Sequence, residues 1–229
     1  RTLGNLTHLT LSYDFGAFGE GSFLVGGQVD AFEVIDSYWI TGSSGDVKSV
    51  EGTLEEKVLP DGDEAIYSGF TQLKHAIGHN RDIIFNVGVR YDYKQRYDYQ
   101  YVNDFTGEDF EVGEDIFAVS PRMAIILAPN SWLGAKFSFS DSFVDAPFFN
   151  RTNRTRNFRG SPLLEPENLR AYQFTPTIRG FSNRFRSSLN MYYLEHKNII
   201  FRKKTLDPGE TLFQNSGELV IGGVESETS

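Results

Sequence analysis

Four arginines and two phenylalanines gather in one short stretch of the chain, APFFNRTNRTRNFRG. Guanidinium groups pair bidentately with carboxylate or phosphate, so this stretch is the best candidate for binding an anionic ligand, with the aromatic rings stacking on it. The alternative is a solvated loop, or arginines that pair with the acidic stretch 102–115. The predicted ligand-binding residues are Phe148, Phe149, Arg151, Arg154, Arg156 and Arg159.

Other residue types that do chemistry carry weaker signals. His75 and His79 have a spacing that suits zinc only on a helix, and here they flank a strand end and a turn. The acidic residues of 102–115 could hold calcium but do not follow the EF-hand pattern, which favours a solvated loop. No Ser-His-Asp set, paired-acid site or phosphate loop stands out. The sequence therefore predicts no enzyme, no metal site and no cofactor.

Composition excludes further classes. The chain has no cysteine, which excludes disulfides and thiolate metal sites. A net charge of -9 argues against nucleic acid as a partner. The mean hydropathy is -0.35, and no apolar run is long enough for a transmembrane helix.

The elements that must position these residues are strands, and the clearest is 82–101. Its odd positions are apolar and then tyrosine-rich, as at Val87 and Tyr93, whereas its even positions are polar or charged, as at Arg90 and Lys94. Side chains alternate across a strand, so the pattern predicts a β-strand with two unlike faces. Unbroken, its 20 residues would extend about 65 Å, several times an ordinary strand.

The same alternation recurs along the chain and predicts an all-β fold of about nine strands. The expected strands cover 3–15, 20–34, 64–77, 82–101, 117–127, 133–143, 172–179, 185–193 and 212–227. Short turns alternate with longer polar connections. The expected outer loops are 35–63, 102–115, 144–168 and, of medium length, 203–211.

Two-faced strands with all long loops at one end are typical of an outer-membrane barrel. The aliphatic side chains would face lipid, the tyrosines would form an interfacial girdle, and the polar face would line an aqueous lumen. We therefore predict an antiparallel up-and-down transmembrane β-barrel segment. A structure in which a second protein layer covers Phe85, Val87 and Tyr91 while Arg90 and Lys94 point into open solvent would contradict this prediction.

Four stretches resemble the TonB-dependent outer-membrane receptors. Residues 86–93, NVGVRYDY, resemble the family's G-x-R-Y-D strand, and 119–129, VSPRMAIILAP, resemble the S-P-R-x-x-x-x-Y-x-P strand that follows. Residues 164–174, LEPENLRAYQF, resemble the L-x-P-E segment that restarts the barrel after a long loop. Residues 213–227, FQNSGELVIGGVESE, resemble the N-x-G-x-x-x-x-x-G-V-E strand. The four occur in family order over about 64–229.

The resemblance implies that residues 1–229 form the middle of a 22-strand barrel, with the plug domain, the energy-coupling box and the C-terminal strands missing. It implies a receptor in the bacterial outer membrane that takes up a scarce, bulky nutrient: a metal chelate such as a siderophore, haem, cobalamin or a glycan. The implied partners are the TonB complex, acting through the missing N-terminal region, outer-membrane lipid and lipopolysaccharide, and the nutrient itself.

Several alternatives stay open within this interpretation. The arginines of 151–159 could bind lipopolysaccharide phosphates rather than a nutrient. The charged residues at even positions 90–98 could line the lumen as a ladder or contact the plug. Two other function classes remain: a passive outer-membrane channel, and a soluble secreted β-protein that binds or cleaves glycans.

Overall fold

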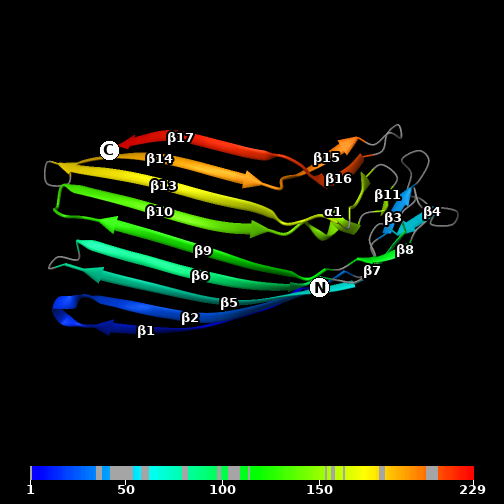
Figure 1. Cartoon of the computed structure of the whole chain (residues 1–229), viewed down its shortest axis with the longest axis horizontal. Coiled ribbons are helices and arrows are strands. Elements are labelled where there is room, and N and C mark those ends of the chain that lie inside the picture. Colours follow the sequence, from blue (N-terminus) through cyan, green and yellow to red (C-terminus); the bar gives the residue numbers. More distant parts are fainter. Residues whose placement is uncertain are drawn as a thin grey trace.

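Nine strands form one antiparallel sheet in which spatial neighbours follow chain order (Figure 1). The structure, a computed structural model, describes residues 2–34, 38–41, 54–57, 62–78, 82–96, 99–102, 109–112, 114–152, 154–155, 158–161, 163–180, 184–204 and 211–229. The sheet contains β1 (Thr2–Asp14), β2 (Glu20–Val34), β5 (Gly62–Ile77), β6 (Ile83–Gln95), β9 (Ile116–Leu127), β10 (Leu133–Val144), β13 (Glu167–Gly180), β14 (Phe185–Lys197) and β17 (Glu218–Thr228). The predicted nine-strand meander is confirmed.

The connections between these strands are short at one end of the sheet and long at the other. Residues 15–19, which include the 3-10 turn η1 (Gly16–Phe18), and residues 78–82, 128–132 and 181–184 make the short turns. Residues 35–61, 96–115, 145–166 and 198–217 make the long ones. Figure 1 shows the turns on the left and all four long connections on the right. The predicted alternation of loop lengths is therefore confirmed.

Small elements occupy the long-connection end. β3 (Tyr38–Thr41) pairs with β4 (Leu54–Lys57), and β7 (Tyr99–Val102) pairs with β8 (Asp109–Val112). A second, four-stranded sheet contains β11 (Arg154–Thr155), β12 (Phe158–Arg159), β16 (Thr211–Asn215) and β15 (Ile200–Lys204). One short helix, α1 (Phe148–Thr152), precedes β11. Among the described residues, no helix has the length and apolar character needed to cross a membrane.

The single strand expected over 82–101 is wrong in its extent. β6 stops at Gln95, and Tyr99–Val102 leaves the main sheet to pair with β8. On one side the neighbouring strand β9 begins at Ile116, opposite Lys94, so the ladder between β6 and β9 ends there. On the other side β6 stays paired with β5 as far as Gln95. The carboxylate of Asp115 accepts the backbone N–H of Arg96, the next residue, at 3.2 Å.

The last expected strand, 212–227, is also two strands. Gly217 has a φ of 95°, a left-handed conformation that breaks the run between β16 and β17. β16 pairs with β15, whereas β17 pairs with β14. The outer connection expected at 203–211 is therefore a longer excursion, 198–217, that contains a hairpin. Likewise β13 starts at Glu167, so the connection expected at 144–168 spans 145–166.

In a water-soluble domain the apolar face of a sheet is buried and the polar face is exposed, whereas in this sheet the apolar face is the more exposed one. On β6 the apolar-face side chains of Val87 and Tyr91 are 46% and 47% exposed, whereas Asp92 and Lys94 on the polar face are 4% and 7% exposed. Among the described residues, the buried apolar side chains are only Ala76, Ala146 and Leu164. No second layer covers the apolar face of the described sheet (Figure 1). The observation that would have overturned the barrel prediction is not found.

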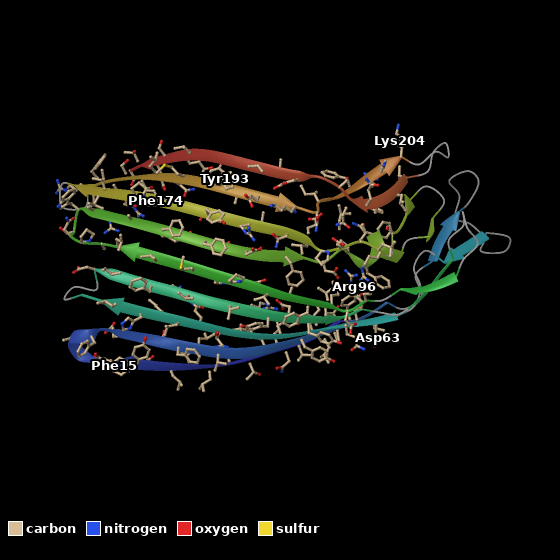
Figure 2. The ribbon with its side chains drawn as sticks, in the orientation of Figure 1. Phe15, Asp63, Arg96, Phe174, Tyr193 and Lys204 are labelled. Atoms are coloured by element: carbon tan, nitrogen blue, oxygen red, sulfur yellow. The ribbon has the colours of Figure 1, made fainter. Side chains whose placement is uncertain are left out.

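Aromatic side chains border the aliphatic region of the apolar face. Tyr67 and Tyr93 lie side by side on β5 and β6, with ring centroids 6.2 Å apart. Tyr172 on β13 is 6.4 Å from Tyr193 on β14, and Figure 2 shows Tyr193 part-way along its strand. From Ile83 to Tyr93, a rise of about 3.3 Å per residue and a tilt near 40° give a height of about 25 Å. This matches the apolar band of a membrane barrel.

A glycine on β2 makes room for an aromatic ring on the polar face. A Cβ built on Gly26 would lie 2.4 Å from the Phe70 ring and 2.7 Å from the Thr7 carbonyl oxygen. Because the backbone of β1 cannot retreat without breaking its ladder, we expect Gly26→Val to destabilise the barrel by about 1–3 kcal/mol. Urea titration of the complete receptor in detergent micelles checks this. The matched control is Gly69→Val, where nothing lies within 4 Å of the built Cβ; equal losses in both variants would contradict the packing argument.

Candidate functional site

The chain that follows β10 folds back over the polar face of the sheet. In the sheet order, β9 separates β10 from β6, and β5 lies beyond β6. Nevertheless Asp145 bonds Lys94 of β6, and Arg151 of α1 bonds Glu64 of β5. Residues 145–152 must therefore cross β9. They cover the long-connection end of the polar face, where Figure 2 shows Arg96 among clustered side chains.

A proline on β9 helps to explain this crossing. β10 pairs with β9 only as far as the Arg122–Ser140 pair, and the next β9 residue is Pro121. Proline has no N–H to donate to a ladder. The end of β10 from Asp141 to Val144 is therefore paired on one side only, with β13. This freedom lets the following segment leave the plane of the sheet toward the polar face.

Five charged side chains form the network that holds the segment in place. Lys94 Nζ lies 2.6 Å from Asp145 Oδ2 and 2.9 Å from Glu64 Oε2. Arg96 Nη2 lies 2.5 Å from Asp145 Oδ1 and donates to the Leu164 carbonyl at 3.3 Å. Arg151, only 2% exposed, bonds the carboxylate of Glu64 and donates from Nε to the Ala146 carbonyl at 3.3 Å. We call these five residues the mouth network.

The mouth network carries an excess of positive charge. Its three cations, Lys94, Arg96 and Arg151, face two carboxylates, Glu64 and Asp145. Arg96 Nε is buried without a hydrogen-bond partner among the described residues. Aromatic rings supplement the carboxylates: Lys94 Nζ lies 5.5 Å from the centre of the Phe32 ring, and the Arg151 guanidinium lies 5.7 Å from that of Phe148. The mouth network by itself therefore has one more cation than anions.

Asp145 makes the attachment of this segment dependent on pH. Burial alone would raise the pKa of Asp145, but bonds from the Lys94 ammonium and the Arg96 guanidinium outweigh burial and lower it. A carboxylate with a lowered folded-state pKa stabilises the fold above its unfolded pKa, about 3.9, and loses this contribution as the pH falls through the folded value. The unfolding temperatures of the receptor and its Asp145→Asn variant should therefore differ by a constant amount above pH 5. Below about pH 4 the difference should shrink; a difference that widens on acidification would contradict this assignment.

A second polar network involves two residues of the predicted ladder, Arg90 and Asp92 of β6. Arg90 Nε donates to Asp92 Oδ1 at 2.8 Å, Nη2 to Ser68 Oγ at 2.7 Å, and Nη1 to Gln28 Oε1 at 3.0 Å. Ser68 in turn donates to Asp92 at 2.5 Å. These bonds tie β2, β5 and β6 together, so the charged side chains serve the sheet itself. Of the predicted ladder, Asp98 lies outside the described residues.

The connection 145–166 also meets the hairpin β15–β16. Arg159 of β12 pairs with Leu212 of β16 in parallel register, which joins two outer connections into one sheet. Phe149 of α1 packs edge-on against Phe213 of β16, with ring centroids 6.5 Å apart. The four-stranded sheet therefore stands beside the segment that covers the mouth network.

Two of the sequence stretches that resemble the receptor family hold this hairpin. Asn215 donates from Nδ2 to the carbonyls of Glu165 at 2.9 Å and Asn198 at 2.8 Å, and its Oδ1 accepts the Glu165 N–H at 2.8 Å. Glu167 accepts the Ile200 N–H at 2.6 Å and lies 3.0 Å from His196 Nε2. The L-x-P-E segment and the N-x-G segment are thus one hydrogen-bonded junction that orients the hairpin.

The structure places the predicted ligand-binding residues in different surroundings. Phe149 is exposed and lies against Phe213, whereas Arg151 is buried in the mouth network. Arg154 and Arg159 form a cross-strand pair in the four-stranded sheet, and Arg156 lies outside the described residues.

His75 Nδ1 lies 3.1 Å from the Tyr13 hydroxyl, and His79 is not among the described residues. No cluster of His, Asp and Glu within the described part of the chain could hold a metal ion.

The comparison with models of protein families shows to which family the chain belongs. The sequence matches the family described as "TonB dependent receptor-like, beta-barrel" over residues 1–229. The chain belongs to this family. Its members are transport receptors of the bacterial outer membrane, so the nine-stranded sheet is a segment of an outer-membrane barrel wall, with the apolar face toward lipid and the polar face toward the lumen.

Solved structures of TonB-dependent receptors share this fold. The haemophore receptor HasR of Serratia marcescens, in complex with HasA and haem, has a TM-score of 0.73 and 16% identity, covering 99% of this chain and 39% of that receptor. The ferric enterobactin receptor PfeA of Pseudomonas aeruginosa has a TM-score of 0.65 and 15% identity, covering 98% and 33%. The ferric-catecholate receptor Fiu of Escherichia coli K12 has a TM-score of 0.60 and 12% identity, covering 99% and 35%. The chain therefore spans two fifths or less of the length of these receptors. The comparison with curated protein sequences gives no match.

Proposed function

We propose that the complete receptor takes up a scarce, bulky nutrient across the outer membrane, powered by the TonB complex acting through a region N-terminal to this chain. The nutrient classes are a metal chelate such as a siderophore, haem, cobalamin or a glycan. In this proposal, residues 1–229 supply part of the barrel wall and four outer connections, and the ligand first contacts Phe148, Phe149, Arg154, Arg156 and Arg159. Arg151 positions their segment through Glu64.

The observation that carries this proposal is the family match over the whole chain. The geometry supports it: a lumen-facing surface is covered at its outer end by residues 145–152, held by the mouth network. The structural neighbours include receptors solved with haem and with enterobactin, which supports nutrient classes of this size.

The experiment expresses the complete receptor in a host that lacks its own receptors, with and without TonB. Labelled haem, ferric enterobactin, cobalamin and a malto-oligosaccharide serve as probes. We expect one probe to bind the cells in both hosts and to accumulate inside only where TonB is present. Accumulation that persists without TonB would identify a passive channel instead, and cleavage of the oligosaccharide without uptake would identify an enzyme.

A further inference from the structure

We propose that the four-stranded sheet of β11, β12, β16 and β15 binds a soluble polyanion, a ligand that carries several carboxylate or phosphate groups. The inference deepens the proposed function and rests on it in one respect, that the ligand enters at the end of the barrel where this sheet lies. It narrows the nutrient to anionic classes and excludes an uncharged glycan.

The first observation is the charge of these four strands. The whole chain has 31 acidic and 22 basic residues. The four strands nevertheless contain no acidic residue, and their cations are Arg154, Arg159, Arg202, Lys203 and Lys204. A cationic surface on an acidic protein concentrates anions and repels cations. The net charge of these four strands is therefore positive, whereas the net charge of the whole chain is negative.

The second observation is the register. Arg154 pairs with Arg159, Arg159 pairs with Leu212, and Leu212 pairs with Lys203. Residues that are successive partners across a sheet occupy one row, and neighbouring strands are about 4.8 Å apart. Three cationic positions thus fall in one row across four strands. A row of this kind suits a ligand with several anionic groups better than a single small ion.

The third observation concerns the described lysines. Lys203 and Lys204 are exposed, and neither has a carboxylate partner within the described part of the chain. Figure 2 shows Lys204 at the outer tip of β15, projecting beyond the ribbon. Phe201, two residues before Lys203 and therefore on the same face of β15, is 51% exposed and adds an apolar surface beside that lysine, whereas Lys204 lies on the opposite face. An ammonium that is not already paired can bind an incoming anion without first breaking a salt bridge.

The fourth observation is the position of the sheet. Phe213 of β16 packs on Phe149 of α1, whose next residues include Arg151 of the mouth network. The junction at Asn215 fixes the hairpin in this orientation. The mouth network beside this sheet has one more cation than anions, so its own net charge does not repel an anion.

The experiment measures binding of tripolyphosphate and citrate to the purified complete receptor in detergent, by calorimetry at low and high salt. We expect Lys203→Gln to bind both anions about tenfold more weakly, since losing one charge-assisted contact amounts to about 1.4 kcal/mol. Added salt should weaken binding to the native receptor more than to the variant, because exposed charges are screened.

The matched control is Lys136→Gln, which removes the same charge near the short-turn end of the nine-stranded sheet. It should leave anion binding unchanged, and the thermal unfolding temperatures of all variants establish that each is folded. A second control, Asp207→Asn/Glu210→Gln, removes the acids of the sequence between β15 and β16 and should strengthen binding. Equal losses of affinity in Lys203→Gln and Lys136→Gln, or no binding of either anion by the native receptor, would overturn the proposal.

Lipid A in micelles is the competing source of phosphate. If lipid A binds in a manner that depends on Lys203 and neither soluble anion competes, the sheet is a lipopolysaccharide contact and the proposal of a soluble ligand fails. The binding measurements need no transport. If the native receptor binds the anions but shows no TonB-dependent accumulation, the proposed function alone is refuted. If the lysine variant takes up its nutrient and binds the anions as tightly as the native receptor, this inference alone is refuted.

Discussion

Replacing Glu64 with alanine is expected to destabilise the receptor by about 3–5 kcal/mol and to release residues 145–152 from the lumen face. Glu64 is 2% exposed and bonds Arg151, itself 2% exposed, as well as lying 2.9 Å from Lys94. Removing one member of a buried ion pair leaves the other charge without compensation, and this cost exceeds the net gain of having the pair. The effect should therefore be far larger than that of an exposed charge.

The measurement combines urea unfolding of the complete receptor with limited proteolysis of residues 145–166. The native receptor should resist cleavage there, and Glu64→Ala should be cut while the strands stay intact. Asp63→Asn is the matched control, because Asp63 is the adjacent residue in β5 and is exposed. The double variant Glu64→Met/Arg151→Met, which removes both charges, should recover most of the lost stability. A Glu64→Ala variant as stable as Asp63→Asn would show that the mouth network does not hold the segment.

Replacing Val87 with arginine should cost about 2–4 kcal/mol in a bilayer, although the side chain is already 46% exposed. In water, a charged substitution at so exposed a site changes stability by about 0.5 kcal/mol or less. Val87 lies in the aliphatic part of β6, four residues before Tyr91, and it pairs with Leu73 and Met123 on the same face. Lipid solvates an arginine poorly, which is the physical reason for the difference.

The measurement is the free energy of folding of the complete receptor into phospholipid vesicles, from urea titration. The matched control is Ala124→Arg, which places the same residue on the lumen face of β9, one residue after the Val87–Met123 pair. We expect the Val87 variant to lose several times more folding free energy than the control. Comparable losses at both positions would mean that the two faces have the same surroundings, contrary to a barrel wall.

The strands and the alternation of the connections could be predicted because they depend on local pattern. The period of two at Val87, Val89 and Tyr91 specifies which face is apolar without any knowledge of the neighbouring strand. The ends of strands were less predictable. Gly217 carried a signal for a break, but it lies within a stretch that matches a family strand, and the alternation on both sides concealed the left-handed turn. The end of β6 coincides with the start of β9 at Ile116, which no local pattern in 82–101 records.

The candidate site was predicted only in part, because its contacts join distant residues. Lys94 and Asp145 are separated by 51 positions, and Glu64 and Arg151 by 87. Each of these residues is an ordinary charged side chain in the sequence, so nothing local distinguishes the buried Arg151 from the arginines that follow it. The parallel pairing of β12 with β16 is likewise invisible in the sequence. It is this pairing that places Lys203 in one row with Arg154 and Arg159, with Leu212 of β16 between them.

The orientation of the sheet between lipid and lumen is tested most directly by a nitroxide scan of β6. Single cysteines at each position from 83 to 95 of the complete receptor, reconstituted in vesicles, would be spin-labelled and their collisions with oxygen and with a water-soluble nickel chelate compared. The account predicts that oxygen accessibility peaks at the odd positions, is greatest near Val87, and falls toward Tyr93. The even positions, from Asn86 through Arg90 to Lys94, should show low oxygen accessibility. Oxygen accessibility without a period of two, or with its peaks at the even positions, would contradict it.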